Sequence, residues 1–235
     1  MPPPLVILTG AGISAESGLA TFRDAGGIWS RVRIEDVATP EAFARDPRRV
    51  HAFYNARRRQ LADPAVQPNA AHHALARLEA AWSAPFLLIT QNVDDLHARA
   101  GSRALLPVHG ALRRARCLAC GETMPWEADL GVDTPCPACG HVGGMRPDVV
   151  WFGEMPQHMD AIEAALGTCA LFASIGTSGQ VYPAAGFVAA VRGNARTVEL
   201  NLEPSAGTLL FDEARHGPAT ETVPAWVDEQ LARWT

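Results

Sequence analysis

Residues 5–23, LVILTGAGISAESGLATFR, predict a buried strand, a tight glycine turn and the start of a helix. Residues 5–8 are apolar and partly β-branched, which is typical of a buried strand. Gly10, Ala11 and Gly12 begin the pattern G-x-G-x-x-A, in which glycine allows a tight turn and a close approach of backbone to a pyrophosphate. A turn between any strand and helix also favours glycine, so nucleotide binding and a simple turn both remain open. The acidic residue that a dinucleotide dehydrogenase places about 20 positions later lies on no obvious second strand, which argues against that class.

The composition limits the classes of protein to which this chain can belong. Its 235 residues suffice for one large domain, or for a domain with a small module. The net charge of −5 argues against non-specific nucleic-acid binding. All 20 basic residues are arginine, so the chain has no lysine of its own for Schiff-base or Walker chemistry. The sequence shows no signal peptide and no segment apolar enough to span a membrane, so we expect a cytoplasmic protein without a membrane partner.

A helix is predicted from residue 47 to about residue 62, because Asp46 and Pro47 are typical of an N-cap and a first helical position. Arg58 and Arg59 are expected to lie beside its buried face, in solvent. That face follows from spacings of four, three and four residues, and it consists of Val50, Tyr54, Arg57 and Leu61.

The arginine in this apolar stripe needs an anionic partner or a route to solvent. One interpretation makes Arg57 part of a structural ion pair, with Glu35 or Asp36, or a snorkelling side chain. The other interpretation makes Tyr54 and Arg57 a site for an anionic group on a ligand. The pattern itself leaves both open.

Strands alternate with helices along the rest of the chain, which predicts a parallel α/β sheet interrupted by inserts. Helices are expected at residues 69–82 and 224–234, and strands at residues 86–90, 105–108, 149–154, 171–175 and 197–202. Polar residues follow several of these strands, where open parallel sheets bind ligands: Asn92, Asp94, His109, Asn201 and Glu203. His109 is either a general base or a hydrogen-bonded structural residue. The Glu203 carboxylate either accepts hydrogen bonds from a ribose or caps the next turn.

Four cysteines form the pattern C-x2-C-x15-C-x2-C: Cys117, Cys120, Cys136 and Cys139. This spacing predicts a tetrahedral zinc site. Four thiolate ligands leave no open coordination position, so such a zinc ion is structural. Two disulfides are the alternative, which a cytoplasmic location disfavours. The fifth cysteine, Cys169, is expected to be a buried thiol.

Taken together, the motifs resemble those of the sirtuin family of NAD-dependent protein deacylases. The resemblance covers nearly the whole chain and rests on GAGISAESG, TFR, TQNVDDLH, VHG, the four cysteines, VVWFGE, GTS and NLEPS, in the family's order. It implies a Rossmann-like parallel sheet that binds NAD, in a domain formed by residues 1–31, 68–110 and 147–235. It also implies a small domain, made of a helical insert (residues 32–67) and a four-cysteine zinc ribbon (residues 111–146).

The resemblance also assigns roles to single residues. His109 resembles the family's general base, while Asn92 and Asp94 resemble the pair that orients the nicotinamide ribose and carboxamide. The other residues implied to contact NAD are Gly10, Ala11, Gly12, Ser14, Phe22, Arg23, Trp29, Gln91, Val93, Gly176, Thr177, Ser178, Asn201, Leu202, Glu203 and Ala219. The residues implied to bind an acylated-lysine peptide, by strand addition in part, are Val150, Trp151, Phe152 and Tyr182.

Two departures from the commonest pattern resemble class III sirtuins, which include bacterial deacylases and desuccinylases. Ala20 and Thr21 replace the usual Pro-Asp, and the following loop carries the small residue Ala25. In that class a tyrosine and an arginine at the spacing of Tyr54 and Arg57 bind the carboxylate of succinyl-lysine. The resemblance therefore implies a deacylase that removes succinyl and acetyl groups. It offers no explanation for Asp95, where the family often has Gly or Asn.

Two other functions compete with this interpretation. An NAD glycohydrolase would use water in place of acyl-lysine, which the peptide-binding motif and the Tyr54–Arg57 pair oppose. A nucleic-acid-binding module would rest on Arg113, Arg114 and Arg116 beside the ribbon, against the negative net charge. We expect acylated-lysine proteins and NAD as partners, no specific nucleic acid, and a monomer.

Overall fold

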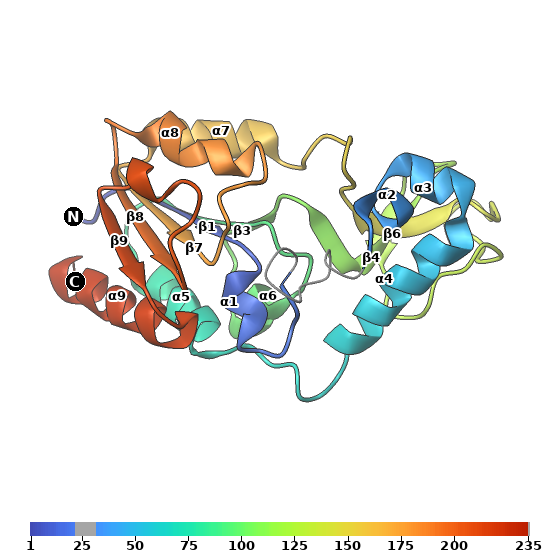
Figure 1. Ribbon diagram of the computed structural model, residues 1–235, viewed down its shortest axis with the longest axis horizontal. Coiled ribbons are helices and arrows are strands. Elements are labelled where there is room, and N and C mark those ends of the chain that lie inside the picture. Colours follow the sequence, from blue (N-terminus) through green and yellow to red (C-terminus); the bar gives the residue numbers. More distant parts are fainter. Residues whose placement is uncertain (22–31, 235) are drawn as a thin grey trace.

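The computed structural model describes residues 1–21 and 32–234, which form a large α/β lobe and a smaller lobe (Figure 1). The large lobe is built on a six-stranded, all-parallel sheet of order β3-β2-β1-β7-β8-β9. Renumbered within this sheet, the order is 3-2-1-4-5-6, the Rossmann arrangement. The strands are β1 (Leu5–Thr9), β2 (Phe86–Thr90), β3 (Leu105–Pro107), β7 (Leu171–Ile175), β8 (Arg196–Asn201) and β9 (Glu213–His216).

Both faces of the large sheet are covered, because successive residues of a strand point to opposite faces. Leu5 and Ile7 face the core beneath α5 (Ala70–Ala81) and α9 (Ala219–Trp234). Val6 and Leu8 face the opposite core, beneath α7 (Met159–Thr168) and α8 (Phe187–Val191). Figure 1 shows the two helix pairs on either side of the sheet. The shorter elements of this lobe are α1 (Gly12–Ala15), α6 (Leu96–Ala100) and two 3-10 turns, η2 (Ala184–Gly186) and η3 (Thr208–Leu210).

The smaller lobe combines a three-stranded antiparallel sheet with a helical insert. The sheet order is β5-β4-β6, with strands β4 (Gly110–Cys117), β5 (Thr123–Pro125) and β6 (Met145–Val149). The insert consists of α2 (Ile34–Val37), α3 (Pro40–Arg45) and α4 (Pro47–Leu61). The predicted fold class is confirmed, whereas the domain limits stay a prediction; the limit at residue 146 lies inside β6. In the described part of the chain, no helix has the length and apolarity to cross a membrane.

The predicted strand at residues 149–154 is wrong. The strand there is β6, which ends at Val149, and the chain then turns. The Trp151 N–H donates to the Glu154 carboxylate at 2.8 Å, and the Glu154 N–H returns to the Trp151 carbonyl at 3.0 Å. Gly153 follows with φ of 91°, a left-handed conformation that glycine adopts readily. The apolar run of residues 149–152 therefore ends a strand and enters a partly exposed turn here, which periodicity alone does not separate from a continued strand.

The prediction that Arg58 lies in solvent is also wrong. Its side chain is only 2% exposed, and Nε donates to the Leu112 carbonyl of β4 at 2.9 Å. Nη1 donates to Oδ1 of Asn55 at 2.8 Å. Arg58 lies four residues after Tyr54, so both side chains lie on the buried face of α4. Arg59 is exposed, as expected, and pairs with Asp129.

Candidate active site

The glycine turn after β1 packs directly against the turn after β7, the neighbouring strand. The Gly12 N–H donates to the Gly176 carbonyl at 2.8 Å, and the Gly10 N–H donates to the Ile175 carbonyl at 2.9 Å. A Cβ on Gly10 or Gly12 would lie within 3 Å of Gly176 backbone atoms. These glycines are therefore required for strand-turn packing at the point where the order of the sheet reverses, where open α/β sheets bind ligands. The helix that follows, α1, has one turn only.

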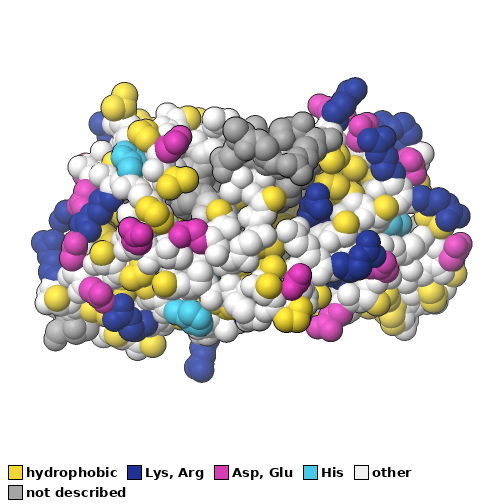
Figure 2. Space-filling model, turned by 60° about the horizontal axis from the view of Figure 1, so that its bottom comes forward, with side chains coloured by type: hydrophobic (Ala, Val, Ile, Leu, Met, Phe, Trp, Pro, Cys, Tyr) yellow, Lys and Arg dark blue, Asp and Glu magenta, His cyan; other side chains and the backbone are white. Residues whose placement is uncertain are grey.

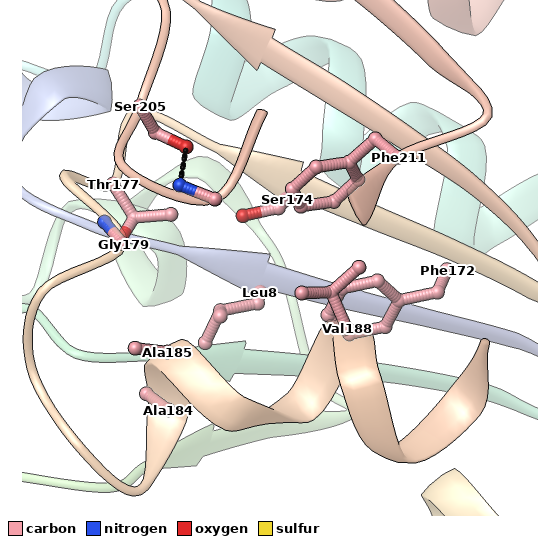
Figure 3. A pocket seen from close by; sticks show the side chains of 11 residues that line it. Leu8, Phe172, Ser174, Thr177, Gly179, Ala184, Ala185, Val188, Ser205 and Phe211 are labelled. Atoms are coloured by element: carbon pink, nitrogen blue, oxygen red, sulfur yellow. Dashed lines mark hydrogen bonds between the residues drawn. The ribbon is translucent and has the colours of Figure 1, made fainter. Parts of the chain in front are cut away.

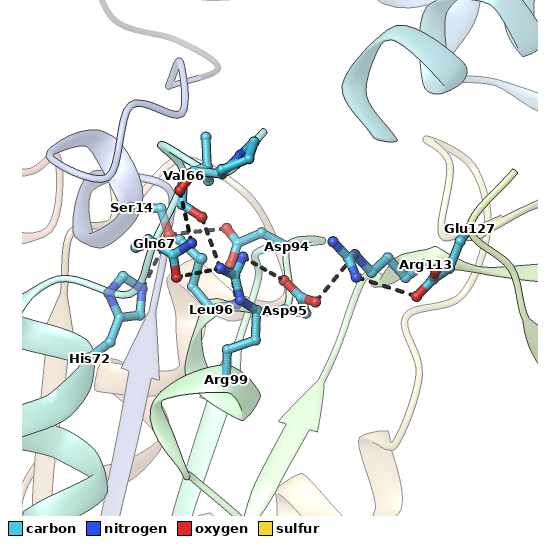
Figure 4. A network of polar contacts seen from close by, with 11 residues as sticks. Ser14, Val66, Gln67, His72, Asp94, Asp95, Leu96, Arg99, Arg113 and Glu127 are labelled. Atoms are coloured by element: carbon cyan, nitrogen blue, oxygen red, sulfur yellow. Dashed lines mark hydrogen bonds and ion pairs between the residues drawn. The ribbon is translucent and has the colours of Figure 1, made fainter. Parts of the chain in front are cut away.

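Ser14 joins the two residues that the sequence places after β2. Its hydroxyl donates to Oδ2 of Asp94 at 3.0 Å (Figure 4). The same hydroxyl accepts from Nδ2 of Asn92 at 3.1 Å. Asn92 is 3% exposed, so its amide is held in one orientation. The structure thus brings together three residues of the predicted NAD site, one from α1 and two from the loop after β2.

Asp94 is a carboxyl group in an unfavourable place for a charge. Burial raises its pKa to about 6, and the nearby negative charge of Asp95 acts in the same direction. The backbone N–H of Leu96, 3.1 Å from Oδ1, and the Ser14 hydroxyl lower the pKa in part. Asp94 therefore titrates close to neutral pH, as groups at functional sites often do.

His72 is a member of this cluster that sequence reasoning missed. Its Nε2 lies 3.4 Å from the Ser14 hydroxyl, and its ring lies 4.8 Å from that of His97. Burial lowers the pKa of His72 to about 4, so the ring is neutral beside Asp94 at neutral pH. The available signal was its place three residues after Asn69, which caps α5 in a capping box completed by the His72 side chain.

His109 follows β3 and lies across from the Gln91 backbone. Its Nδ1 is 3.0 Å from the Gln91 carbonyl oxygen. Because a carbonyl only accepts, Nδ1 carries the proton, and the lone pair of the neutral ring is on Nε2. Burial lowers the pKa of His109, which keeps this ring neutral at pH 7. The imidazole can thus accept a proton on Nε2.

Thr177 connects the turn after β7 to two other loops. Its hydroxyl accepts from Nε2 of Gln91 at 3.1 Å, and its carbonyl accepts from Nδ2 of Asn201 at 2.9 Å. The predicted contacts Leu202 and Glu203 follow Asn201 and are exposed. Val93, Ser178 and Ala219 are half-buried in the loops and helix end around them, whereas Phe22, Arg23, Ala25 and Trp29 lie outside the described residues.

A small cavity lies on the other side of β1, under α8 (Figure 3). Its walls are mostly apolar side chains, among them Leu8, Phe172 and Val188. A volume of about 20 Å³ holds a single water molecule and excludes a nucleobase. Thr177, which also lines this cavity, belongs to the loops at the carboxyl edge of the sheet, so the cavity adjoins the candidate site and is too small to be the site itself.

Arg57 is a half-buried cation for which no ion pair occurs among the residues that the structure describes. Its guanidinium lies 4.6 Å from the centre of the Phe53 ring, and its Nε is buried without a hydrogen-bond partner. The interpretation of Arg57 as a partner of Glu35 or Asp36 is wrong, because these carboxylates pair with other arginines: Arg33, Arg45 and Arg49. Tyr54 beside it is 6% exposed, and burial raises the pKa of its hydroxyl, which stays neutral.

The segment after β6 uses its backbone donors within the protein. The Val150 N–H donates to the His109 carbonyl at 2.9 Å, and the Phe152 N–H donates to the Ala38 carbonyl at 3.0 Å. The Trp151 side chain is buried, with the Arg146 guanidinium 3.3 Å from the centre of its ring. A peptide strand added here would therefore meet carbonyl acceptors rather than free N–H donors of these residues. Tyr182, also predicted to contact the peptide, is 78% exposed.

The four ribbon cysteines lie together with their sulfur atoms pointing at one centre. All four Sγ atoms lie within 4.8 Å of one another, and two of the separations are 3.8 and 3.9 Å. A zinc ion with Zn–S bonds of about 2.3 Å requires tetrahedral S–S edges of about 3.8 Å. The donor set thus fits zinc with no position left for a substrate. Cys169 is buried, as predicted, and its thiol donates to the Leu171 carbonyl.

The arginines beside the ribbon are paired with acidic residues. Arg114 and Arg116 both contact the buried carboxylate of Asp148, at 3.5 and 2.9 Å. Arg113 contacts Asp95 at 3.3 Å. On the face in Figure 2, basic and acidic side chains are interspersed. This pairing leaves little free positive charge for a nucleic-acid backbone.

The fold and the site define a nucleotide-binding α/β protein with a four-cysteine zinc ribbon. A model of the Sir2 family matches residues 10–183, and the chain belongs to this family. It is 58% identical over 227 residues to an NAD-dependent protein deacylase of Bdellovibrio bacteriovorus, covering 97% of this chain and 96% of the relative. It is 56% identical over 231 residues to one of Caulobacter vibrioides, again covering 97% and 96%. A solved Sir2 homologue with NAD has a TM-score of 0.88 and 38% identity, covering 98% of this chain and 90% of that one.

Proposed function

We propose that this protein is an NAD-dependent protein-lysine deacylase that removes succinyl and acetyl groups. The observation that carries the proposal is the cluster of Asn92, Ser14 and Asp94 next to the proton acceptor His109, at the carboxyl edge of a Rossmann sheet. Membership of the Sir2 family and the names of its bacterial relatives support the same activity.

NAD supplies a nicotinamide leaving group and a ribose that accepts the acyl group. Asn92 and Asp94 would orient the nicotinamide end, since Ser14 holds both side chains in place. Nε2 of His109 would take the proton of a ribose hydroxyl, because Nδ1 is committed to the Gln91 carbonyl. The loops at Gly10, Gly176, Thr177 and Asn201 would hold the remainder of the dinucleotide, with Gly12, Ala11, Ser178, Leu202, Glu203 and Ala219 around them.

The acyl specificity is proposed from Tyr54 and Arg57. A half-buried guanidinium with an unpartnered Nε, beside a neutral hydroxyl, suits a carboxylate that brings its own negative charge. A succinyl group carries such a carboxylate, whereas an acetyl group does not. Val150, Trp151, Phe152 and Tyr182 remain the proposed contacts of the peptide.

We also propose that residues 1–31, 68–110 and 147–235 act as the NAD-binding domain, with residues 32–67 and 111–146 as the small domain. A cytoplasmic location is proposed because zinc-ligating cysteines must stay reduced. The proposed monomer is tested by light scattering of the purified protein.

The test of the proposed function is nicotinamide release from NAD with one peptide in three forms: unmodified, acetylated and succinylated on lysine. Release with the acylated forms only, and fastest with succinyl-lysine, is the expected result. Release with acetyl-lysine alone would contradict the carboxylate site while keeping the deacylase. Release that needs no acyl group would replace the proposal by an NAD glycohydrolase.

A further inference from the structure

Asp95 is a carboxylate that lies between two arginines from different parts of the fold. Its Oδ2 is 3.3 Å from Nε of Arg113 on β4, and its Oδ1 is 3.7 Å from Nη1 of Arg99 on α6 (Figure 4). The Asp95 side chain is only 25% exposed, so the pairs are screened less than surface pairs. Asp95 therefore joins the large lobe to the first strand of the small sheet.

Arg99 extends this contact to a second connection between the lobes. Its Nη2 donates to the Val66 carbonyl at 2.9 Å and to Oε1 of Gln67 at 2.7 Å. Residues 62–69 lead from α4 in the small lobe back to α5 in the large lobe, and β4 leads from β3 into the small sheet. Asp95 and its two arginines thus hold together two of the segments through which the chain passes between the lobes.

Within α6 the Asp95 side chain makes one ion contact, with Arg99 four residues later, and no capping hydrogen bond. It occupies the N-cap position of α6, where an aspartate usually accepts from the first turn of the helix, yet it makes no capping bond. The N–H of Leu96 is instead taken by the side chain of Asp94, at 3.1 Å. The two neighbouring carboxylates thus have different partners. Asp94 contacts Ser14 and the first N–H of α6, and Asp95 contacts the two arginines.

We propose that Asp95 is a positioning residue that, through Arg99 and Arg113, fixes where the Asp94 carboxylate lies in the cofactor site. The inference rests on the proposed function, because Asp95 acts through a group of that site. Loss of the two ion contacts leaves the bond from the Leu112 N–H to the Val93 carbonyl, at 2.8 Å, between this loop and β4. The end of the loop at Asp95 is then held to neither lobe connection by its side chain, so the Asp94 carboxylate beside it is positioned less tightly against Ser14.

Charge gives a second route by which Asp95 acts on Asp94. The negative charge of Asp95 raises the pKa of Asp94, while Arg99 lowers it. The other groups around Asp94 are the Ser14 hydroxyl on α1, with the neutral His72 of α5 beyond it, and Arg113 on β4 beyond Asp95. Removing the charge of Asp95 therefore lowers the pKa of Asp94, and the acid limb of any rate that needs ionised Asp94 moves to lower pH.

The test compares Asp95→Asn with a matched control, Glu127→Gln. Both changes replace a carboxylate that contacts Arg113 by its amide, but the Glu127 side chain is 81% exposed. The readouts are kcat and KM for NAD with an acylated peptide from pH 5 to 8, and urea unfolding. For Asp95→Asn we expect a fall in kcat/KM of about 3- to 10-fold and an acid limb at lower pH, and for Glu127→Gln a change of less than about twofold.

A second variant, Arg113→Met, removes the same contact from the small sheet. In the double variant, we expect the fold-loss in kcat/KM to be smaller than the product of the fold-losses of Asp95→Asn and Arg113→Met alone. Equal behaviour of Asp95→Asn and Glu127→Gln would overturn the inference. The inference would also be overturned if Asp95→Asn lost activity with an unchanged acid limb and its loss of stability explained that loss of activity. Asp95 would then be only structural. A wild-type protein inactive on every acylated peptide would instead overturn the proposed function.

Discussion

Nδ1 of His109 lies 3.0 Å from the backbone carbonyl of Gln91, so the ring is held in the tautomer that leaves Nε2 free to accept a proton. Burial keeps the same ring neutral at pH 7. Gln91 belongs to the loop after β2, and His109 follows β3, its neighbour in the sheet. A base with one defined acceptor nitrogen thus results from the pairing of two adjacent parallel strands.

Replacing this base tests its role directly. We expect His109→Tyr to lower deacylation by at least about 100-fold, because no group with a pKa near neutrality replaces the imidazole. Far-ultraviolet circular dichroism and the urea midpoint should stay close to wild type, since His109 is only half-buried. Substantial turnover in a folded variant would remove His109 from the role of general base.

Asp94→Asn should separate stability from function. Burial raises the pKa of Asp94 to about 6, so the folded state binds its proton more tightly than the unfolded state. The stabilising effect of this protonated carboxyl is complete below about pH 4 and is lost as the pH rises through about 6. At pH 8 we therefore expect Asp94→Asn to be more stable by about 1–2 kcal/mol, yet inactive. Urea unfolding at pH 5 and pH 8 checks this, and an equal effect at both values would contradict it.

Arg57→Met should affect one acyl group more than another. A charged hydrogen bond to a carboxylate is worth about 1.5–3 kcal/mol, so desuccinylation should fall about 10- to 100-fold while deacetylation changes little. The matched control is Arg59→Met, which makes the same change in charge on the same helix at an exposed residue paired with Asp129. Equal losses on both substrates would show that Arg57 is structural.

Arg58→Met should destabilise the small lobe. The change removes the side-chain donor to the buried Leu112 carbonyl and one of the two donors to Oδ1 of Asn55, which still accepts from the Leu130 N–H, at a cost of about 3 kcal/mol. Arg59→Met, again the control, should cost less than about 0.5 kcal/mol. The measurement is the free energy of urea unfolding, and indistinguishable values would contradict the buried position of Arg58.

Removal of zinc should lower the stability of the protein without directly inhibiting the reaction. The ribbon sulfurs form a closed set of four, so a chelator is expected to lower the melting temperature rather than compete with NAD or peptide. Cys120→Ser should lose the metal, measured by elemental analysis, whereas Cys169→Ala should keep it. Competitive inhibition by the chelator against NAD would contradict a structural site.

Local patterns in the sequence predicted several of the strands and helices, and the metal site. Strand periodicity predicted residues 86–90 and 171–175 with the bounds of β2 and β7, and Asp46 with Pro47 predicted the start of α4. The cysteine spacing predicted a four-sulfur cluster, because two short knuckles largely set the ligand geometry themselves. The strands, the helix start and each cysteine knuckle depend on residues that are close together in the chain, whereas the two knuckles meet across 16 to 22 residues.

Tertiary structure alone decided which distant side chains meet. Ser14 and Asp94 are 80 residues apart and hydrogen-bond because β1 and β2 are parallel neighbours whose carboxyl ends share one edge. The burial of Arg58 depends on β4 lying against α4, which no helical pattern contains. The contacts of Asp95 depend on where α6 meets the small sheet. A sequence pattern indicates which residues of one helix or strand are buried. The residues that they contact in other helices and strands are determined by how these elements pack.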